Sequence, residues 1–277
     1  MATTRRAAEA ERFEFGRNWA QFLALVDEPR IRQAEESLQL ALGENDLTGK
    51  SFLDVGSGSG LFSLAARRLG ARVVSFDRDP ESVACTEAMR LRYRPKDPNW
   101  TVQPGDVLDL GWLRTLGQFD IVYAWGVLHH SGDMRKAFEN VAALISPGGK
   151  LFLAIYNDQG RATRYWTIIK RIYNRLPRAL RVLVVGPAFV RTWGPVTIRD
   201  FLRGKSFDSW RTYAINNTRG MSAWTDFIDW VGGYPFEVAK PEEVFDFYNA
   251  NGFALSYLKT CAGGLGCNEF VFLNRSM

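Results

Sequence analysis

Alternating glycines follow an aspartate early in the chain, and a second aspartate stands further on. The first run reads DVGSGSG over residues 54–60, and Asp77 follows it by 17 residues. A dinucleotide fingerprint would require glycine at position 61, where the chain has Leu61, and no lysine follows at P-loop spacing. A carboxylate beside this bare backbone would repel a pyrophosphate, so the pattern indicates a ligand that carries positive charge.

Asp77 closes the segment RVVSFD, residues 72–77, which is typical of a short strand. A carboxylate at that place can accept hydrogen bonds from both hydroxyls of a ribose. A ribose next to a cationic group indicates S-adenosylmethionine, which carries a sulfonium and an α-ammonium. Asp106 follows the next predicted strand, where it can accept from an adenine amino group beside the Val107 amide. The alternative is a glycine turn that only packs a strand against a helix. Four features in the order expected for a cofactor site argue against this alternative: the glycine run, Asp77, Asp106 and the segment FDIVYAWGVLHH at the end of the fourth predicted strand.

From residue 51 onward, short apolar segments typical of strands alternate with segments of helical periodicity. This alternation predicts a parallel sheet with helices on both faces. Helical spacing also marks residues 7–26 and 29–42, with Gly43 as a cap. A helix at 241–252 leads into two strands that predict an antiparallel hairpin at the sheet edge. The predicted strands are residues 51–55, 72–77, 100–103, 119–124, 150–156, 253–260 and 268–273, and the helices among the first five are 61–69, 81–91 and 134–145.

Five segments resemble the successive motifs of class I S-adenosylmethionine-dependent methyltransferases: FLDVGSGSG, SFDRDP, PGDVLD, FDIVYAWGVLHH and SPGGKLFLAIYN. The last two are most similar to the branch that methylates quinone rings and other small molecules. The resemblance covers about residues 50–157 and, weakly, the terminal hairpin, and it implies a Rossmann-like seven-stranded sheet and transfer of a methyl group to an acceptor. Combined with the residue pattern, the predicted fold is an α/β, Rossmann-like seven-stranded, mostly parallel sheet with an antiparallel terminal hairpin and a helical insertion. The resemblance implies cofactor contacts by Asp54, Gly56, Gly58, Asp77 and Asp106, and the complete predicted cofactor set adds Ser57, Gly60, Arg78, Val107 and Trp125.

Four side chains at the ends of the fourth and fifth predicted strands are candidates for the transfer chemistry. His129 and His130 are the only histidines of the chain, and either can take a proton from an acceptor near neutral pH. Their alternative role is to close the loop that follows the strand. Tyr156 and Asn157 can orient an acceptor by hydrogen bonds, or they can cap the backbone where the sheet ends.

Together these features predict an enzyme that transfers a methyl group from S-adenosylmethionine to an O, S, N or C atom of a small-molecule or lipid-linked acceptor. In-line displacement would leave S-adenosylhomocysteine. Two alternatives stay open: an RNA methyltransferase that holds phosphates with basic residues, and a non-catalytic protein that binds S-adenosylmethionine. Strongly salt-dependent RNA binding would favour the first. Loss of the glycine turn or of Asp77 would favour the second, and both are present.

The chain is predicted to divide into an N-terminal helical lid, residues 1–48, and a methyltransferase domain, residues 49–277. Arg17 in the lid is expected near the methionine carboxylate of the cofactor. Residues 160–235 form a basic, aromatic-rich helical insertion into that domain. Pro177, Pro187 and Pro195 are expected to interrupt its helices, and the acids and aromatics of residues 226–237 form either a wall of the acceptor pocket or the core of the insertion.

Positive charge is concentrated in the insertion. Residues 161–220 hold 13 Lys and Arg against Asp200 and Asp208, a net charge of +11, which leaves −6 for the rest of a chain whose net charge is +5. Three interpretations remain: a solvated helical cover over the active site, a surface that contacts anionic membrane, and nucleic-acid binding. The third ranks last because the chain has no recognised RNA-binding module. One helical face of the segment holds Trp166, Ile169, Ile172, Tyr173 and Leu176.

Composition favours a cytoplasmic protein, peripheral to the membrane if the insertion contacts lipid. Three scattered cysteines fit a reducing compartment, and the first 16 residues lack the apolar region of a secretory signal. The longest apolar run, residues 183–190, is too short to span a bilayer. Cys85, Cys261 and Cys267 lack the spacing of a metal site, so no metal is predicted, and the sequence carries no signal of an oligomeric state.

Overall fold

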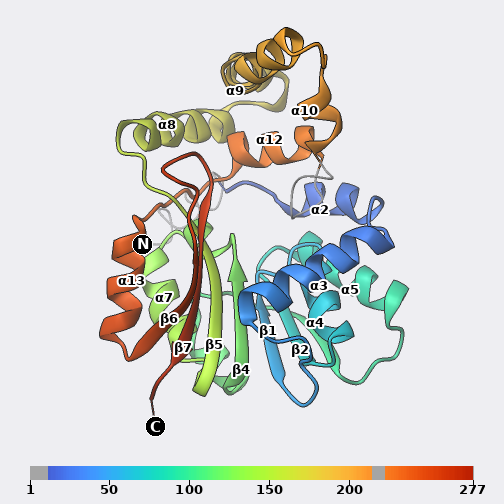
Figure 1. The fold of residues 1–277 in the computed structure, drawn as a ribbon, viewed down its shortest axis with the longest axis vertical. Helices are drawn as coiled ribbons and strands as arrows, with labels where there is room; N and C mark the ends of the chain where they lie inside the picture. The colour runs from blue at the N-terminus through green and yellow to red at the C-terminus, as the bar shows by residue number, and fades with distance from the viewer. Residues whose placement is uncertain (1–11, 214–221, 277) are drawn as a thin grey trace. The chain divides into compact units, whose positions relative to one another are not determined.

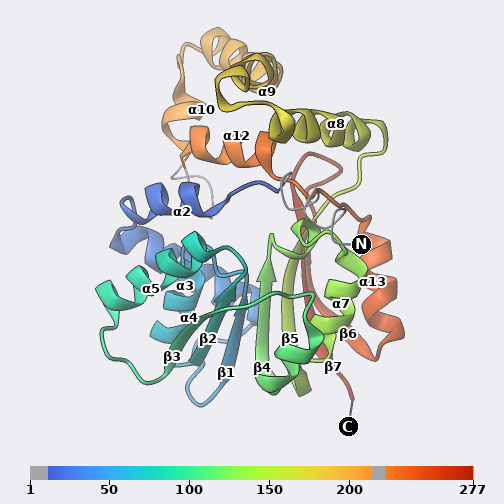
Figure 2. The ribbon, with the colours of Figure 1, turned by 180° about the vertical axis from the view of Figure 1, so that it is seen from behind.

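A seven-stranded sheet lies at the centre of the larger of two compact units in the computed structural model, which describes residues 12–213 and 222–276. The strand order is β3-β2-β1-β4-β5-β7-β6 (Figures 1 and 2). The first five strands are parallel, and β7 is antiparallel to both β5 and β6. The predicted α/β, Rossmann-like fold with an antiparallel terminal pair is therefore confirmed. The strands are β1 (Ser51–Val55), β2 (Arg72–Asp77), β3 (Trp100–Pro104), β4 (Phe119–Trp125), β5 (Ile145–Tyr156), β6 (Phe253–Lys259) and β7 (Cys267–Asn274).

Helices cover both faces of this sheet (Figures 1 and 2). The strand order reverses between β1 and β4, and open α/β sheets bind ligands where strands diverge in this way. The loops after the carboxyl ends of β1 to β5 therefore form the expected site. One face carries α3 (Glu28–Leu42), α4 (Leu61–Arg68) and α5 (Pro80–Tyr93), with α2 (Gly16–Leu23) packed on α5, and the other carries α6 (Leu110–Thr115), α7 (Met134–Ala142) and α13 (Pro241–Ala250).

Capping residues set the ends of these helices. The side chain of Asp27 accepts a hydrogen bond from the Arg30 amide at 3.1 Å where α3 begins. Gly43 ends α3 with φ 67°, a left-handed conformation that favours glycine, so the predicted cap is confirmed. Asp79 accepts from the Glu81 amide at 3.0 Å, and Pro80 takes the first position of α5.

Apolar side chains from the central strands form the core of the unit. Leu53 of β1, Val122 of β4 and Leu153 of β5 are completely buried. Phe138 of α7 and Tyr248 of α13 pack against that face of the sheet. Parallel strands with helices on both faces are expected to be buried in this way. The core fixes the strand ends and thereby gives the loops of the site a rigid base.

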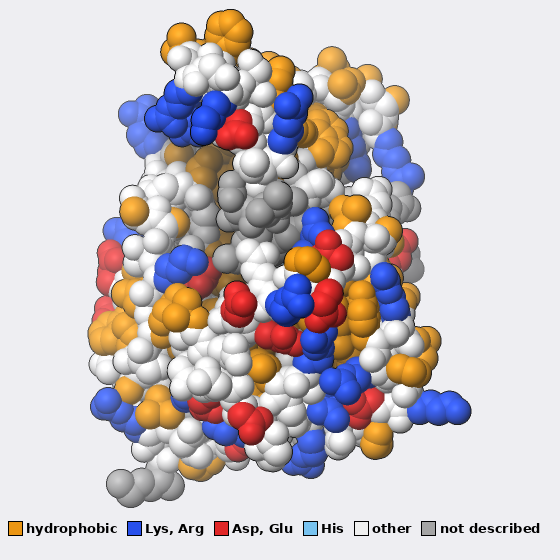
Figure 3. All heavy atoms as spheres, turned by 45° about the vertical axis from the view of Figure 1, so that its right-hand side comes forward, with side chains coloured by type: hydrophobic (Ala, Val, Ile, Leu, Met, Phe, Trp, Pro, Cys, Tyr) orange, Lys and Arg blue, Asp and Glu red, His pale blue; other side chains and the backbone are white. Residues whose placement is uncertain are grey.

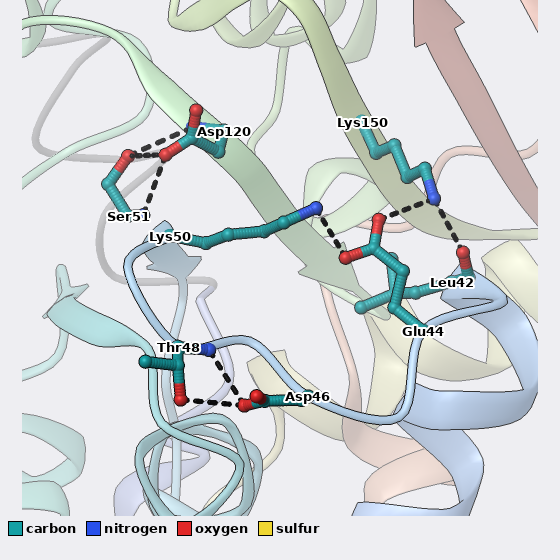
Figure 4. Close-up of polar contacts among 8 residues, drawn as sticks. All are labelled: Leu42, Glu44, Asp46, Thr48, Lys50, Ser51, Asp120 and Lys150. Carbon is teal, nitrogen blue, oxygen red and sulfur yellow. Dashed lines mark hydrogen bonds and ion pairs between the residues drawn. The ribbon is translucent and has the colours of Figure 1, made fainter.

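Polar contacts fix the amino-terminal edge of the sheet, at the other end of the strands from the predicted site (Figure 4). The Asp120 carboxylate accepts from the Ser51 amide at 2.8 Å and from its hydroxyl at 2.7 Å, which joins β4 to β1. Lys150 of β5 donates to the Leu42 carbonyl at 2.6 Å and to Glu44 at 2.7 Å, and Lys50 also pairs with Glu44. These contacts tie the end of α3 to the strands and hold their register.

The start of β5 differs from its prediction. The predicted helix 134–145 ends at Ala142, and β5 begins at Ile145, so that the SPGG segment belongs to the strand. The Asn274 side chain donates to the Ile145 carbonyl at 2.9 Å, and Ile145 pairs with Phe119 across a register shift in β4. The SPGG segment, which was expected to end a helix, is therefore part of β5 because hydrogen bonds to residues distant in sequence hold it in the sheet. The short helix α6 was not predicted.

The second compact unit comprises residues 12–14 and 160–236. One part of its prediction is wrong: α9 continues through Pro187 and Pro195, whereas Pro177 does separate α8 from the next turn. A proline can continue a helix at the loss of one hydrogen bond. Across the described residues, no helix is long and apolar enough to cross a membrane. The helices here are α8 (Arg161–Arg175), η2 (Arg178–Leu180), α9 (Val182–Leu202), α10 (Asp208–Arg211) and α12 (Ala223–Gly232).

Aromatic residues and a buried lysine form the core of this helical unit. Trp166 and Tyr173 of α8 are buried, and the Trp166 ring lies 5.3 Å from that of Trp230 on α12. The Lys170 ammonium lies 4.4 Å from the Trp230 ring centroid and donates to the Trp230 carbonyl. Burial lowers the pKa of Lys170 to about 7, although nearby Asp229 opposes the shift. These contacts favour a core role for residues 226–236.

Candidate functional site

The glycine run forms a tight turn between β1 and α4. The backbone amides of Gly56 and Ser57 both donate to the Phe76 carbonyl of β2, at 2.8 and 3.0 Å. Gly56, Gly58 and Gly60 have φ values of 70°, 54° and 76°, a region that side chains other than glycine rarely adopt. The turn therefore needs glycine at these positions for its backbone conformation alone.

Neighbouring side chains also leave no room on the turn. A Cβ at Gly56 would lie 2.5 Å from a methyl of Val127, and one at Gly58 would lie 2.9 Å from the Trp19 ring. Val127 follows β4, and Trp19 belongs to α2, in the segment predicted as a lid. Neither residue could be predicted as part of the site, because a glycine pattern in the sequence does not reveal which side chains pack on it. The side chain of Arg17 lies outside the described part of the chain.

Helix α5 holds the turn from its other side. The Ser57 and Thr86 hydroxyls lie 2.8 Å apart, and the Thr86 hydroxyl donates to the Gly58 carbonyl at 3.2 Å. A Cβ at Gly60 would lie 3.0 Å from the Thr86 backbone. The predicted residues Ser57 and Gly60 are therefore buried supports of the turn, and Thr86 joins them.

Asp77 ends β2 directly beside the glycine turn. Its Oδ2 accepts from the Gly58 amide at 3.1 Å, and its Oδ1 accepts from the Asp79 amide at 2.9 Å. Burial raises the pKa of this carboxyl to about 6, although the amide hydrogen bonds oppose the shift. The carboxylate and the turn thus lie together, as the sequence predicted for a ligand that contacts both.

Asp106 lies at the end of the neighbouring strand, since the Gly105 amide donates to the Asp77 carbonyl at 3.0 Å. Its Oδ1 accepts from the Leu108 amide at 2.9 Å, and its Oδ2 lies 3.3 Å from the Arg78 guanidinium. The Asp106 side chain is 34% exposed and the Arg78 side chain is 38% exposed. The two predicted residues Arg78 and Asp106 therefore face the same edge as Asp77.

Asp54 has a different environment from the other predicted carboxylates. It is buried and accepts from the Ser63 hydroxyl, which lies 2.7 Å from the Ser75 hydroxyl. The Trp100 indole donates to Ser75 at 2.9 Å, so the network ties β1 to α4, β2 and β3. Burial raises the pKa of Asp54 to about 7, and the charge of Asp77 raises it further. The side chain supports the base of the glycine turn, and direct contact with a ligand stays a prediction.

Val107 and Trp125 flank the same edge from two sides. Val107 is buried, and its carbonyl accepts from the Asn140 side chain of α7 at 2.8 Å. Trp125 is the last residue of β4 and is partly exposed. The Gly126 amide then bonds to the Ala154 carbonyl of β5 at 3.2 Å. The chain after β4 is thereby held against β5.

His129 is completely buried behind this edge. Its Nδ1 accepts from the Tyr156 amide at 3.4 Å, and its ring centroid lies 4.0 Å from that of Tyr156. The His129 carbonyl accepts from the Glu237 amide at 3.0 Å. A proton on Nδ1 would face the N–H of Tyr156, so these contacts favour the loop-closing role over that of a base.

His130 is partly exposed and lies among three rings. Its centroid is 4.9 Å from Phe15, 4.5 Å from His129 and 5.5 Å from Tyr156. The structure thus brings both histidines and Tyr156 together at the ends of β4 and β5. Of the two histidines, only His130 is partly exposed.

Asn157 faces the terminal hairpin. The Asn157 Oδ1 accepts from the Asn268 side chain at 3.1 Å, and the Asn157 backbone N–H donates to the Gly266 carbonyl at 3.0 Å. These bonds favour its capping role over acceptor orientation. Glu237 ends the segment predicted as a pocket wall or as the core of the insertion. Its carboxylate accepts from the Met134 amide at 3.1 Å at the start of α7, and burial raises its pKa. It anchors the chain beside the histidines.

The donor set matches the chemistry of S-adenosylmethionine better than that of a phosphate. Two carboxylates, Asp77 and Asp106, end adjacent strands beside the turn, and the first turn of α4, residues 61–64, contains no base. Carboxylates accept from ribose hydroxyls and amino groups, and they attract a cation. In the described ranges, no group of three or more His, Cys, Asp or Glu is placed to hold a metal ion.

Comparisons with known proteins agree with this arrangement. Residues 26–219 match the model of a family described as a methyltransferase domain. The chain is 32% identical over 158 residues to a ubiquinone biosynthesis O-methyltransferase of Coxiella burnetii, strain Dugway 5J108-111, a match that covers 56% of this chain and 62% of that protein. An enzyme with the same designation from Xanthomonas oryzae pv. oryzae, strain PXO99A, is 32% identical over 168 residues, with 60% and 62% covered. The chain thus spans less than two thirds of these curated relatives.

Solved structures share the fold at low sequence identity. The magnesium protoporphyrin IX methyltransferase of Synechocystis PCC 6803, with bound S-adenosylhomocysteine, has a TM-score of 0.51 at 14% identity, with 89% of this chain and 84% of that chain covered. The N-methyltransferase NodS of Bradyrhizobium japonicum WM9, also with S-adenosylhomocysteine, has a TM-score of 0.51 at 16% identity, with 95% and 100% covered. At these identities the likeness shows the fold.

Proposed function

This chain belongs to the methyltransferase domain family, and from that premise we propose that it transfers a methyl group from S-adenosylmethionine to a small-molecule or lipid-linked acceptor. The observation that carries the proposal is the Asp77 carboxylate at the end of β2, hydrogen-bonded to the Gly58 amide of the glycine turn. Both parts of the predicted cofactor site meet there. In-line displacement would release S-adenosylhomocysteine.

We assign the cofactor contacts residue by residue. Asp77 accepts from the ribose hydroxyls, Asp106 and the Val107 amide bind the adenine, and the turn of residues 56–60 holds the methionine portion. Arg78 orients Asp106 through their ion pair, and Trp125 borders the cofactor. The bound cofactor supplies an electrophilic methyl group on its sulfonium. The protein positions an acceptor in line with that methyl and excludes water.

The acceptor atom is proposed to be an oxygen. Two relatives at 32% identity are O-methyltransferases of ubiquinone biosynthesis, which supports a small or lipid-linked hydroxyl compound as acceptor. The shared fold itself does not choose the atom, since a protoporphyrin methyltransferase and an N-methyltransferase have it too. A hydroxyl acceptor requires removal of its proton, and His130 is the proposed base, with Tyr156 orienting the acceptor.

Alanine at position 130 is expected to lower turnover by about 100-fold, because general-base catalysis contributes at least that factor. It should also flatten the rise of rate with pH around the pKa of a histidine. His129→Ala is the matched variant: it should lower thermal stability and leave the shape of the pH profile unchanged. Transfer of labelled methyl to a panel of phenols and quinols measures the turnover and the pH profile of both variants, and thermal unfolding measures their stability. Full activity of His130→Ala at every pH would remove the base assignment.

Calorimetric titration with S-adenosylmethionine and S-adenosylhomocysteine tests the proposed function directly. We expect both to bind in the micromolar range, about −8 kcal/mol. A separate titration with NADH, which carries a pyrophosphate, should give no heat. The turn has Leu61 at the position where a dinucleotide fingerprint has its third glycine. If neither sulfur compound binds, the proposed cofactor site is wrong.

The same proposal extends to where the enzyme works. We propose a cytoplasmic enzyme that contacts anionic membrane through residues 161–220, which carry a net charge of +11. A lipid-linked acceptor would be presented at such a surface.

A further inference from the structure

The outer face of α9 carries an apolar stripe that no described residue of its own unit covers. Counting by helical turns, Leu183, Pro187, Val190, Gly194, Ile198 and Phe201 follow one another along one side of the helix. The four large side chains among them, Leu183, Val190, Ile198 and Phe201, are between 63% and 71% exposed. The stripe runs from Leu183 to Phe201, which is 18 helical steps or about 27 Å of helix.

The inner face of α9 is already occupied, so the stripe is not a second core surface. Phe189 packs on Trp210 and Phe227 at 5.5 and 5.4 Å between ring centroids. Trp193 packs on Trp210 at 4.7 Å, and buried Asp200 accepts from the Ser209 amide at 2.8 Å. Aromatic and polar contacts thus hold the helix to its unit, and aliphatic side chains lie on the outside.

Basic residues occur along the same segment of chain as the stripe. Residues 178–207 contain six Lys and Arg and a single acid, which is the buried Asp200. Arg191, Arg199, Arg203 and Lys205 are exposed. Figure 3 shows hydrophobic side chains beside Lys and Arg side chains on the helical unit. An exposed apolar stripe on a segment that also carries exposed basic residues combines the two properties that bind a helix to an anionic lipid surface.

We infer that α9 lies in the plane of an anionic membrane, with its outer face inserted at the level of the lipid headgroups. The inference deepens the membrane contact of the proposed function, on which it rests, and assigns it to one helix. A nucleic acid would need exposed aromatic rings for stacking, whereas this stripe is mostly aliphatic. A second copy, related by twofold symmetry, would bring the basic residues of both copies face to face.

The helix has features of a surface element. Pro187 and Pro195 each remove a backbone hydrogen bond to the carbonyl four residues earlier, at Leu183 and Arg191, and both of those residues are exposed. Unsatisfied carbonyls are costly in the hydrocarbon core and can bind water at the headgroup level. This agrees with the absence of a membrane-spanning helix among the described residues.

A vesicle-binding assay on the full chain tests the inference. Wild-type protein is mixed with phosphatidylcholine vesicles, with and without phosphatidylglycerol, and the bound fraction is measured by flotation. The double variant I198D/F201D should bind the anionic vesicles at least tenfold more weakly than wild type. The control L40D changes an equally exposed leucine, 73% on α3 of the other unit, and should bind as wild type does.

Three outcomes would overturn the inference. One is unchanged binding of I198D/F201D, and another is equal binding of wild type to neutral and anionic vesicles. The third is a wild-type dimer, seen by sedimentation, that the double variant converts to monomer, which would make a second copy the occupant. Titration of each preparation with S-adenosylmethionine checks folding. If wild-type protein does not bind S-adenosylmethionine, the methyltransferase proposal is wrong. The vesicle-binding assay would still test the role of α9 in that case.

Discussion

Asp77→Ala is expected to weaken S-adenosylmethionine binding by about tenfold or more, with little loss of folded protein. The carboxylate accepts from the Gly58 and Asp79 amides at 3.1 and 2.9 Å, and in the proposed complex it also accepts from the ribose hydroxyls. Hydrogen bonds to a charged group are worth about 1.5–3 kcal/mol, which corresponds to a factor of ten or more. Calorimetry on wild type and variant measures the change.

The same carboxyl should make cofactor affinity depend on pH. Burial raises its pKa to about 6. Only the ionised form accepts hydrogen bonds with both oxygens, so a proton on Asp77 opposes binding. Wild-type affinity is therefore expected to fall as the pH drops through about 6, relative to the neutral variant Asp77→Asn, in which this dependence is absent.

A control separates the site from the fold. Asp120→Asn changes a carboxylate at the amino-terminal edge, where it accepts from the Ser51 amide at 2.8 Å. It should lower stability and leave cofactor affinity unchanged. Equal affinity of Asp77→Ala and wild type at pH 7.5 would withdraw the ribose assignment.

Gly56→Ala is expected to reduce cofactor affinity more than tenfold and to destabilise the protein by about 2–4 kcal/mol. A left-handed φ of 70° costs any residue with a Cβ about 1–2 kcal/mol. The new Cβ would also lie 2.5 Å from a methyl of Val127, a branched side chain that cannot simply swing away. Either the turn or the segment after β4 has to move, and both border the proposed cofactor site.

Two matched variants divide this effect into its parts. Gly117→Ala meets the same backbone strain, since its φ is 79° and nothing lies within 4 Å of its Cβ position. It should lose only about 1–2 kcal/mol and keep its cofactor affinity. The double variant Gly56→Ala/Val127→Ala should recover part of the stability that Gly56→Ala loses. If Gly56→Ala binds the cofactor as wild type does, the turn is only a packing feature.

The strands and the glycine turn could be predicted because their signals are local. Short segments of four to six residues, ended or soon followed by glycine or aspartate, correctly indicated β1 to β4, and Gly43 ends α3 as its residue type suggests. The start of β5 could not be predicted, because Asn274 holds the Ile145 carbonyl from 129 residues away. A local SPGG signal for a helix stop loses to that bond and to pairing with Phe119.

The strand ends that carry the candidate site residues were predicted better than the surroundings of those residues. Asp54 and Asp77 have the same residue type, but Asp54 is enclosed by Ser63 and its neighbours whereas Asp77 meets the glycine turn. His129 and His130 are adjacent in sequence, yet one is buried and the other is partly exposed. Such differences depend on side chains from distant segments, such as Glu237 and Phe15, that spacing does not reveal.

The helical insertion leaves the sheet and returns to it at one point. The Asp158 amide donates to the Ala239 carbonyl at 3.2 Å, and the Ala239 amide donates to the Tyr156 carbonyl at 3.0 Å. The chain from residue 160 to residue 236 is therefore a loop whose stem is closed by the sheet itself. A segment joined to the sheet in this way can be replaced during evolution without disturbing strand register, so the proposed membrane contact can change while the proposed cofactor site is retained.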